Sequence, residues 1–98
     1  MLAKKQRLTA AEVREILKSG RSARSATLSA KYVRAQDARA AVVVSSKVAK
    51  TAVLRNKLRR AAYAVLCTAL TKNIHVVFFL HKPILDPAEL KELCLKLS

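Results

Sequence analysis

The stretch VLRNKLRR at residues 53–60 carries the strongest pattern in this 98-residue chain. Leu54 and Leu58 are four positions apart and share one side of a helix, while the basic residues between them turn to the other side. The surrounding segment, residues 38–85, holds nine Lys or Arg and no Asp or Glu. Basic residues on an exposed helix are usually paired with Glu one turn away. This face is therefore expected to meet a polyanion instead.

The helix around this stretch is predicted over residues 50–70, which are rich in Ala and Leu. Its inner stripe is expected to comprise Leu54, Leu58, Ala61, Ala62, Val65 and Ala69. The opposite face is expected to carry Arg55, Asn56, Arg59, Arg60 and Tyr63, with Lys57 toward the flank. Guanidinium groups suit phosphate oxygens, Asn suits a ribose or base edge, and Tyr can stack on a base. This face is a candidate RNA-binding surface; an ordinary solvated helix face is the alternative.

The segment before this helix is expected to be a strand and a loop. Residues 39–45 contain the β-branched run AAVVV, which predicts a buried central strand. The loop SSKVAK at residues 45–50 then leads into the helix. Its backbone N–H groups, with Lys47 and Lys50, can hold a phosphate at the helix N-terminus. An ordinary strand-to-helix loop is the alternative.

The amino-terminal third is expected to hold a basic arm, a helix and a strand. Residues 1–8 form the arm, which includes Arg7, and TAAE at residues 9–12 is a capping box that starts a helix over about residues 10–19. Gly20 is a natural helix end. Apolar Leu28, Ala30 and Tyr32 then alternate with Thr27, Ser29 and Lys31. This alternation predicts a half-buried strand, with a short extra strand near residues 21–23 and a turn at 35–38.

The carboxy-terminal third is expected to hold a strand and a helix. Residues 74–80 form a continuous apolar run, typical of a buried strand. DPAE at residues 86–89 places Asp at the N-cap, Pro at the first helical position and Glu at the third. Leu90, Leu93, Cys94 and Leu97 form the expected inner face. The whole chain, residues 1–98, is thus predicted to be one α+β domain, a small α–β sandwich of order α-β-β-(β)-α-β-α.

Composition narrows the function classes. Twenty basic and six acidic residues give a formal charge of +14, which favours nucleic acid or an anionic surface as partner. No apolar run approaches the roughly 18 residues of a membrane span, and no signal-peptide pattern follows Met1, so a cytoplasmic protein without a membrane partner is expected. Cys67 and Cys94 are flanked by apolar residues and are predicted to be buried thiols.

Signals for a protein active site are weak. His75 and His81 are six residues apart on the predicted strand and share a face, but no Asp or Glu is near them in sequence. The spacings typical of metal-binding His and Cys are missing from the sequence. One Gly allows no glycine-rich phosphate loop. No catalytic residue and no protein-held metal are therefore predicted.

The chain resembles the protein subunit of bacterial ribonuclease P over essentially its whole length. RNKLRR at residues 55–60 is similar to that family's Arg-Asn-Arg-aliphatic-basic-Arg signature. VSSKVAKTAV at residues 44–53 is similar to the family's Val-Ser-Lys-Lys-Val-Gly-Lys-x-x-Val. The arm KKQRL at residues 4–8, the helix ending at Gly20 and the apolar VVFF at residues 76–79 also fit.

The resemblance implies a fold and a role. It implies that the longest helix lies in a left-handed βαβ crossover, against the usual right-handed rule. It implies one protein bound to one catalytic RNA, with no obligate protein partner. That RNA removes the 5′ leader from precursor tRNA with Mg²⁺ that it largely holds itself. The protein would thus be the non-catalytic subunit of an endoribonuclease.

The resemblance also implies a cleft between the first helix and the sheet that receives the single-stranded leader. The matching positions are Val13, Leu17, Ser29 and Lys31. The family often has aromatic residues here, so this groove is expected to lack a stacking aromatic. It is expected to hold a leader mainly through Lys31 and backbone phosphate, with little base preference. The alternative is that Val13 and Leu17 only complete the core.

The sequence also leaves two competing functions open. A small structural, ribosomal-type RNA-binding protein would show the same charge without any link to tRNA cleavage. A free-standing protein nuclease would need a carboxylate cluster or a His pair, which the sequence does not offer.

Overall fold

The structure is a computed structural model that describes residues 7–69 and 73–97. Its elements are α1 (Ala10–Ser19), β1 (Arg21–Arg24), β2 (Leu28–Arg34), β3 (Arg39–Val43), α2 (Ala52–Ala69), β4 (Ile74–Leu80) and α3 (Pro87–Lys96). The predicted α+β order is confirmed, including the short extra strand. Within the described ranges, no helix is both long enough and apolar enough to cross a membrane.

The four strands form one mixed sheet in the order β1-β2-β4-β3. β1 and β2 pair antiparallel, β2 and β4 pair antiparallel, and β3 and β4 pair parallel. The prediction of a central strand at residues 39–45 was wrong, because β3 lies at the edge of the sheet. Its apolar run is explained by helices on both faces: Ala40 and Val42 face one helix layer, and Ala41 faces the other.

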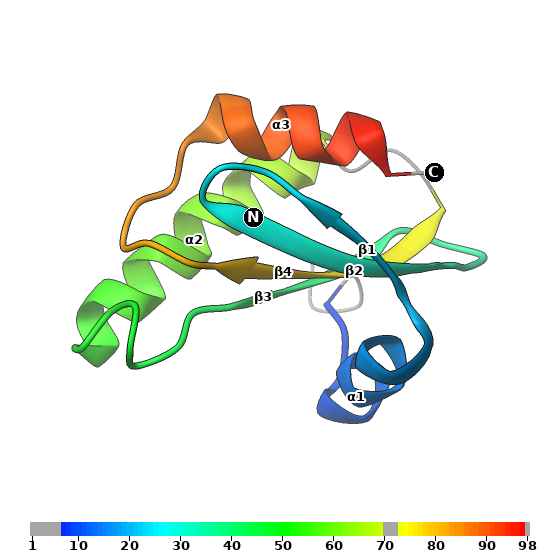
Figure 1. Ribbon diagram of the computed structural model, residues 1–98, viewed down its shortest axis with the longest axis horizontal. Helices are drawn as coiled ribbons and strands as arrows, with labels where there is room; N and C mark the ends of the chain where they lie inside the picture. The colour runs from blue at the N-terminus through cyan, green and yellow to red at the C-terminus, as the bar shows by residue number, and fades with distance from the viewer. Residues whose placement is uncertain (1–6, 70–72, 98) are drawn as a thin grey trace.

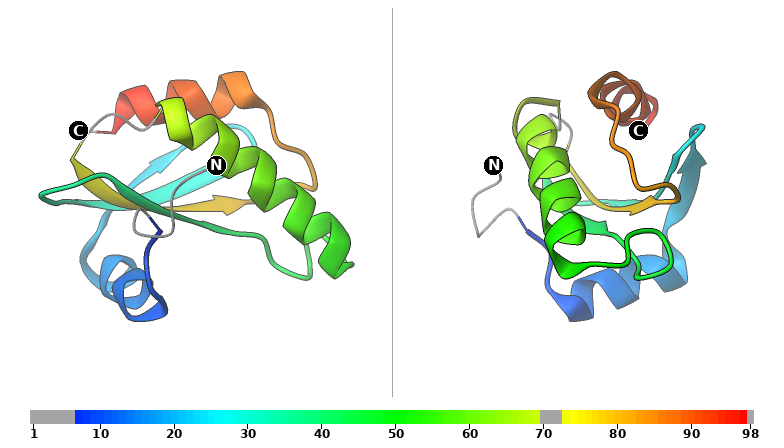
Figure 2. Two further views of the ribbon diagram at one scale, coloured as in Figure 1. Left: turned by 180° about the vertical axis from the view of Figure 1, so that it is seen from behind. Right: turned by 90° about the vertical axis from the view of Figure 1, so that its left-hand side faces the viewer.

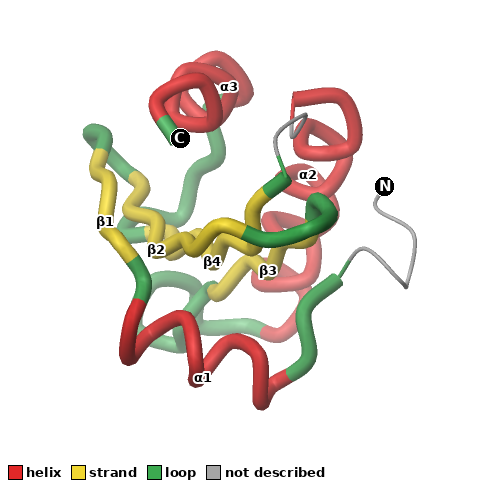
Figure 3. Tube along the Cα trace, turned by 90° about the vertical axis from the view of Figure 1, so that its right-hand side faces the viewer, coloured by secondary structure: helices red, strands yellow, loops and turns green. Residues whose placement is uncertain are grey.

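Helices cover the sheet on both sides (Figure 1). α2 and α3 lie against one face, while α1 crosses the other face alone (Figure 2). The tube in Figure 3 shows the same three layers end-on, with α2 linking β3 to its neighbour β4. This β3–α2–β4 crossover is left-handed (Figures 1 and 3), in line with the family expectation.

The large core fills the space between the sheet and the α2–α3 layer. Leu28, Ala30 and Tyr32 of β2 point into it, as the alternation predicted. The predicted inner face of α3 is also confirmed, since Leu90, Leu93, Cys94 and Leu97 are all buried.

Two expectations for α2 fail. The buried stripe runs through Leu58, Ala62 and Leu66, whereas Ala61 is exposed. Ala61 precedes Ala62 by one residue and is turned about 100° away from that line. For the same reason Cys67, one residue past Leu66, is exposed and not a buried thiol.

The opposite face of the sheet carries a much smaller core. Ile16 of α1 packs on Ala41 and Val77 of the sheet. The predicted capping box starts α1, with Thr9 and Glu12 each accepting from the other's backbone N–H. Gly20 ends α1 in an extended conformation, and a Cβ here would lie 2.5 Å from the Ile16 carbonyl oxygen. Glycine is needed at this position because the backbone of residue 20 lies too close to the Ile16 carbonyl oxygen to leave room for a Cβ.

The start of α3 departs from a capping box. Asp86 accepts from the backbone N–H of Ala88, as predicted for an N-cap. Glu89 instead reaches across to the β1–β2 turn, where it accepts hydrogen bonds from Ser25 Oγ and from Thr27 N and Oγ1. These bonds, the one from Ser25 first, hold the pKa of Glu89 below its usual value. Glu89 therefore ties α3 to the strand hairpin.

Candidate nucleic-acid interface

The outer face of α2 is hollowed and basic. A hollow of about 440 Å³ is lined by Arg7, Val42, Asn56, Arg59, Arg60 and Tyr63. A second hollow of about 480 Å³ is lined by Val53, Asn56, Lys57 and Arg60. Five of the predicted residues of α2 and its flank therefore share one surface with Arg7 from the amino-terminal arm. We call this set, Arg7, Asn56, Lys57, Arg59, Arg60 and Tyr63, the α2 surface.

The cations of this surface have no carboxylate partners among the described residues. In residues 7–69 and 73–97, ion pairs join only Glu12, Arg39, Asp37 and His75, which lie on the α1 side of the sheet. Within the α2 surface Arg59 donates to the side-chain oxygen of Asn56. The positive field of the surface is thus left for an external anion.

Arg7 and Tyr63 form one wall of the hollow. The Arg7 guanidinium lies 5.5 Å from the centre of the Tyr63 ring, within cation–π range. The Tyr63 hydroxyl accepts a hydrogen bond of 3.2 Å from the backbone N–H of Val42. Arg7 Nε is buried and is the one such side-chain nitrogen without a hydrogen-bond partner in the described residues. Tyr63 is therefore fixed by β3 and has Arg7 over its ring, so little of it is open to a base.

Arg55 differs from the other predicted residues. Its Nη1 atom donates to the carbonyl oxygens of Ala49, at 3.0 Å, and Lys50, at 3.4 Å. Arg55 thus ties the loop before α2 to the helix, and it lines neither of the two hollows. Helical periodicity placed Arg55 correctly on the polar side of α2. It could not show that the loop at residues 45–50 brings two carbonyl oxygens within hydrogen-bonding distance of the Arg55 side chain.

The loop at residues 45–50 leaves both predicted lysines, Lys47 and Lys50, exposed. Thr51 caps α2, because its Oγ1 accepts from the backbone N–H of Leu54 at 3.1 Å. One backbone N–H group at the start of α2 therefore already has a hydrogen-bond acceptor. The side chains of Lys47 and Lys50 remain available to a phosphate.

A groove lies between α1 and the sheet, with a volume of about 330 Å³. Its lining comprises Leu17, Ser22, Ala23, Arg24, Ser29, Ala30, Lys31 and Phe79. Three of the four predicted leader-cleft residues, Leu17, Ser29 and Lys31, are brought together here. Lys31 Nζ donates to the Leu17 carbonyl oxygen at 3.2 Å and so joins β2 to the last turn of α1. Val13 instead packs with the small core, as the alternative for that residue stated.

The lining of this groove includes one aromatic residue in addition to the positions that the sequence analysis matched. Phe79 lines it from β4, whereas its neighbour Phe78 is fully buried on the other face. Successive residues of a strand point to opposite faces, so one of two adjacent phenylalanines had to face α1. The sequence pattern did not reveal that Phe79 faces α1, because residues 74–80 are apolar throughout and were predicted to be a strand buried on both faces.

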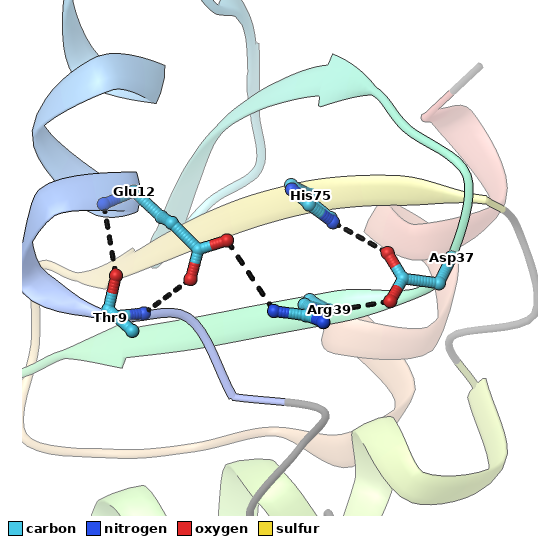
Figure 4. Close-up of polar contacts among 5 residues, drawn as sticks. All are labelled: Thr9, Glu12, Asp37, Arg39 and His75. Carbon is cyan, nitrogen blue, oxygen red and sulfur yellow. Dashed lines mark hydrogen bonds and ion pairs between the residues drawn. The ribbon is translucent and has the colours of Figure 1, made fainter.

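A chain of polar contacts ties the amino-terminal end of α1 to the sheet (Figure 4). Arg39 lies 3.5 Å from Glu12 and 2.9 Å from Asp37, and His75 Nε2 lies 2.8 Å from Asp37. We call Glu12, Arg39, Asp37 and His75 the clasp. The hydrogen bond from His75, followed by that from Arg39, lowers the pKa of Asp37. Tertiary folding therefore supplies the carboxylate that His75 lacks in sequence.

His81 faces the groove side as well, with Nε2 at 2.8 Å from Ser29 Oγ. The two histidines thus share a face, as predicted, but have different partners. Among the described residues no three His, Cys, Asp or Glu side chains gather as a metal site would require.

Comparisons with known proteins agree with this arrangement. The family model for ribonuclease P matches residues 2–97. No curated protein sequence matches the chain. The ribonuclease P protein of Staphylococcus aureus is 20% identical and superposes with a TM-score of 0.74 over 90% of this chain and 87% of its own. That of Thermotoga maritima is 22% identical, with a TM-score of 0.73 and 91% of each chain covered.

At these identities the solved structures establish the fold, and the family match covers nearly all of the sequence. The resemblance that rested on RNKLRR and its flanking segments is thereby confirmed. The chain belongs to the ribonuclease P protein family.

Proposed function

We propose that this ribonuclease P protein binds a catalytic RNA through the α2 surface and assists that RNA in removing the 5′ leader from precursor tRNA. The observation that carries the proposal is the set of cations, on α2 and at Arg7, that have no carboxylate partner in the part of the chain that the structure describes. A structured RNA brings closely spaced phosphates, and neutralising them releases counterions, which drives binding. Arg59 and Arg60 offer planar donors for phosphate oxygens, and Asn56 adds an amide for a ribose or base edge.

Catalysis is assigned to the RNA in this proposal. The carboxylates of Glu12, Asp37 and Glu89 are each taken up by protein donors, so these groups do not fit a Mg²⁺ site. Mg²⁺ would be held mainly by the RNA and would activate the attacking water there. The protein's part is electrostatic: its cations reduce phosphate repulsion and so lower the Mg²⁺ concentration that the RNA needs.

The groove between α1 and β2 is the proposed place of the leader. Lys31 and Arg24 supply positive charge on β2 and β1, and Ser29 supplies a hydroxyl between them. With the catalytic RNA on one side of the molecule and the leader on the other, the protein would hold precursor tRNA more tightly than mature tRNA. We place this assembly in the cytoplasm, with no membrane and no obligate protein partner.

Reconstitution with a bacterial ribonuclease P RNA tests the proposal. The protein should increase cleavage of precursor tRNA at low Mg²⁺, and the protein alone should not cleave. Robust cleavage by RNA-free protein would assign catalysis to the protein. Tight binding to ribosomal RNA, with no effect on ribonuclease P RNA, would favour the ribosomal-type alternative.

A further inference from the structure

The segment before α1 runs along the open edge of the sheet. β3 is an edge strand that pairs with β4 on one side only. On its other side the backbone N–H of Leu8 donates to the Ala40 carbonyl oxygen at 3.1 Å, and Arg7 pairs with Ala40 in a parallel bridge. Figure 3 shows the chain passing from the start of α1 beside β3 toward α2. This segment therefore joins the α1 face of the sheet to the α2 surface.

Both ends of the segment are held by β3. On the α1 face, Arg39 Nη1 lies 3.5 Å from Glu12 Oε2 at the first turn of α1. On the α2 face, the Arg7 guanidinium lies over the Tyr63 ring, and the hydroxyl of that ring accepts from the backbone N–H of Val42. One strand thus supports a contact of the clasp and a contact of the α2 surface, only three positions apart.

Glu12 links the clasp to the backbone of this segment (Figure 4). Its Oε1 atom accepts from the backbone N–H of Thr9 at 2.9 Å, which closes the capping box. Its Oε2 atom faces Arg39, which Asp37 holds from the other side at 2.9 Å. The second oxygen of Asp37 lies 2.8 Å from His75. The clasp therefore fixes the place on β3 from which the amino-terminal segment starts.

The position of Arg7 depends on this backbone path. Its Nε atom is buried and has no hydrogen-bond acceptor within residues 7–69 and 73–97. It lines a hollow together with Arg59 and Arg60. Like charges repel, so these two cations oppose the contact between Arg7 and the Tyr63 ring. The backbone contacts of residues 8 and 9 therefore supply much of the constraint on Arg7.

We infer that Glu12 and Arg39 are positioning residues for RNA binding: their ion pair on the α1 face keeps the amino-terminal segment on β3 and so holds Arg7 in the α2 surface, on the opposite face. This inference rests on the proposed function and says how one member of the α2 surface is set in place. Coupling between two sites is reciprocal. RNA that binds Arg7 therefore also stabilises the start of α1, although α1 lies on the other side of the sheet.

The most direct test is Glu12→Gln, measured as affinity for ribonuclease P RNA. Gln at this position can still accept from Thr9 in a capping box, but it cannot form an ion pair with Arg39. The variant removes one negative charge from a chain of formal charge +14, so net charge alone would strengthen RNA binding. The inference requires the opposite: binding should weaken by about 2- to 5-fold, the range that a partly exposed ion pair can supply.

Glu15→Gln is the matched control. Glu15 lies on the same helix at an exposed position, and the variant makes the same change in charge. It should not weaken RNA binding. Unchanged or stronger binding with Glu12→Gln, as in this control, would overturn the inference.

A double-mutant cycle with Arg7→Ala shows whether the effect passes through Arg7. Arg7→Ala alone should weaken RNA binding at least as much as Glu12→Gln, and adding Glu12→Gln to it should cause no further loss. Equal losses from Glu12→Gln in both backgrounds would overturn the inference, because the ion pair would then act on the fold as a whole. In all these outcomes the unaltered protein binds the RNA, whereas failure of the proposed function would leave no such binding to measure.

Amide hydrogen exchange provides a readout that is independent of affinity. Saturating ribonuclease P RNA should slow exchange in the first turn of α1, where the backbone N–H of Val13 donates to the Thr9 carbonyl oxygen. Arg7→Ala should abolish this protection at saturating RNA, while protection along α2 remains. Equal protection of α1 with and without the Arg7 side chain would contradict the coupling, because RNA would then reach α1 by another route.

Discussion

The two faces of the sheet are built by different means. The α2–α3 face is held by a continuous apolar core, and the outer surface of α2 carries cations that have no acidic partner among the described residues. The α1 face has only a small apolar core around Ile16, to which the clasp and the Lys31 contact are added. A layer held by a large core is a rigid base for a charged surface. A layer held largely by exposed polar contacts can open at a lower free energy, which suits the proposed role of the groove in admitting a single-stranded leader.

The sharpest test of this difference compares two buried side chains. Leu66→Ala in α2 removes a fully buried residue of the large core and should cost about 3 kcal/mol of the free energy of unfolding. Ile16→Ala in α1 should act more locally, by increasing opening of α1. Urea unfolding measures the first effect, and amide hydrogen exchange measures the second. Equal acceleration of exchange in α1 and α2 by Ile16→Ala would show that the two layers form one cooperative unit.

The next effect concerns charge on α2. Replacing Lys57, Arg59 and Arg60 with Ala should weaken binding to ribonuclease P RNA by about 100-fold at roughly 0.1 M salt. Each lost phosphate contact removes about 0.7 from the slope of log K against log salt concentration, so three lost contacts reduce the slope by about two. The control is the triple variant of Lys18, Lys91 and Lys96 on α1 and α3. Both variants change the formal charge from +14 to +11, since 14 − 3 = 11. Similar losses in both would mean that net charge, and not the α2 surface, sets affinity.

A smaller effect separates structure from recognition within α2. Arg55→Lys keeps the charge but removes the planar donor that reaches Ala49 and Lys50. It should cost about 1 kcal/mol of stability, the typical value of such a bond, with little change in the salt slope of RNA binding. Arg60→Lys, on the exposed surface, should leave stability unchanged. A large RNA-binding defect in Arg55→Lys at unchanged stability would return Arg55 to the binding surface.

The smallest effect lies in the clasp and depends on pH. The pKa of Asp37 is lowered by His75 and Arg39, and that of Glu12 chiefly by the backbone N–H of Thr9. A lowered pKa in the folded state stabilises the protein above the group's usual pKa, and the gain is lost as pH falls through the folded value. Asp37→Asn should therefore slightly lower the urea midpoint at neutral pH. The difference in urea midpoint between Asp37→Asn and wild type should vanish when the pH is well below 3.8, the usual pKa of Asp. A difference that persists at such a pH would exclude the charge of the Asp37 carboxylate as its cause.

Much of the fold followed from local patterns. The capping box at Thr9, the alternation through Leu28, Ala30 and Tyr32, and the inner face of α3 were predicted and confirmed, because each depends on residues within one element. The family followed from RNKLRR for the same reason. Ala61 and Cys67 were placed wrongly, since an error of one position on a helix turns a side chain by about 100°.

The remaining features depend on contacts between distant segments. Helical periodicity put Arg55 among the exposed cations, but the path of the loop gave its guanidinium two carbonyl partners. The sequence offered His75 no carboxylate within reach, and the pairing of β3 with β4 brought Asp37 to it. Phe79 appeared as part of an apolar run until the register set it beside Ser29, on the face of the sheet that packs against α1. Local sequence sets which way a side chain points along its own element, whereas strand register and helix packing set what it meets there.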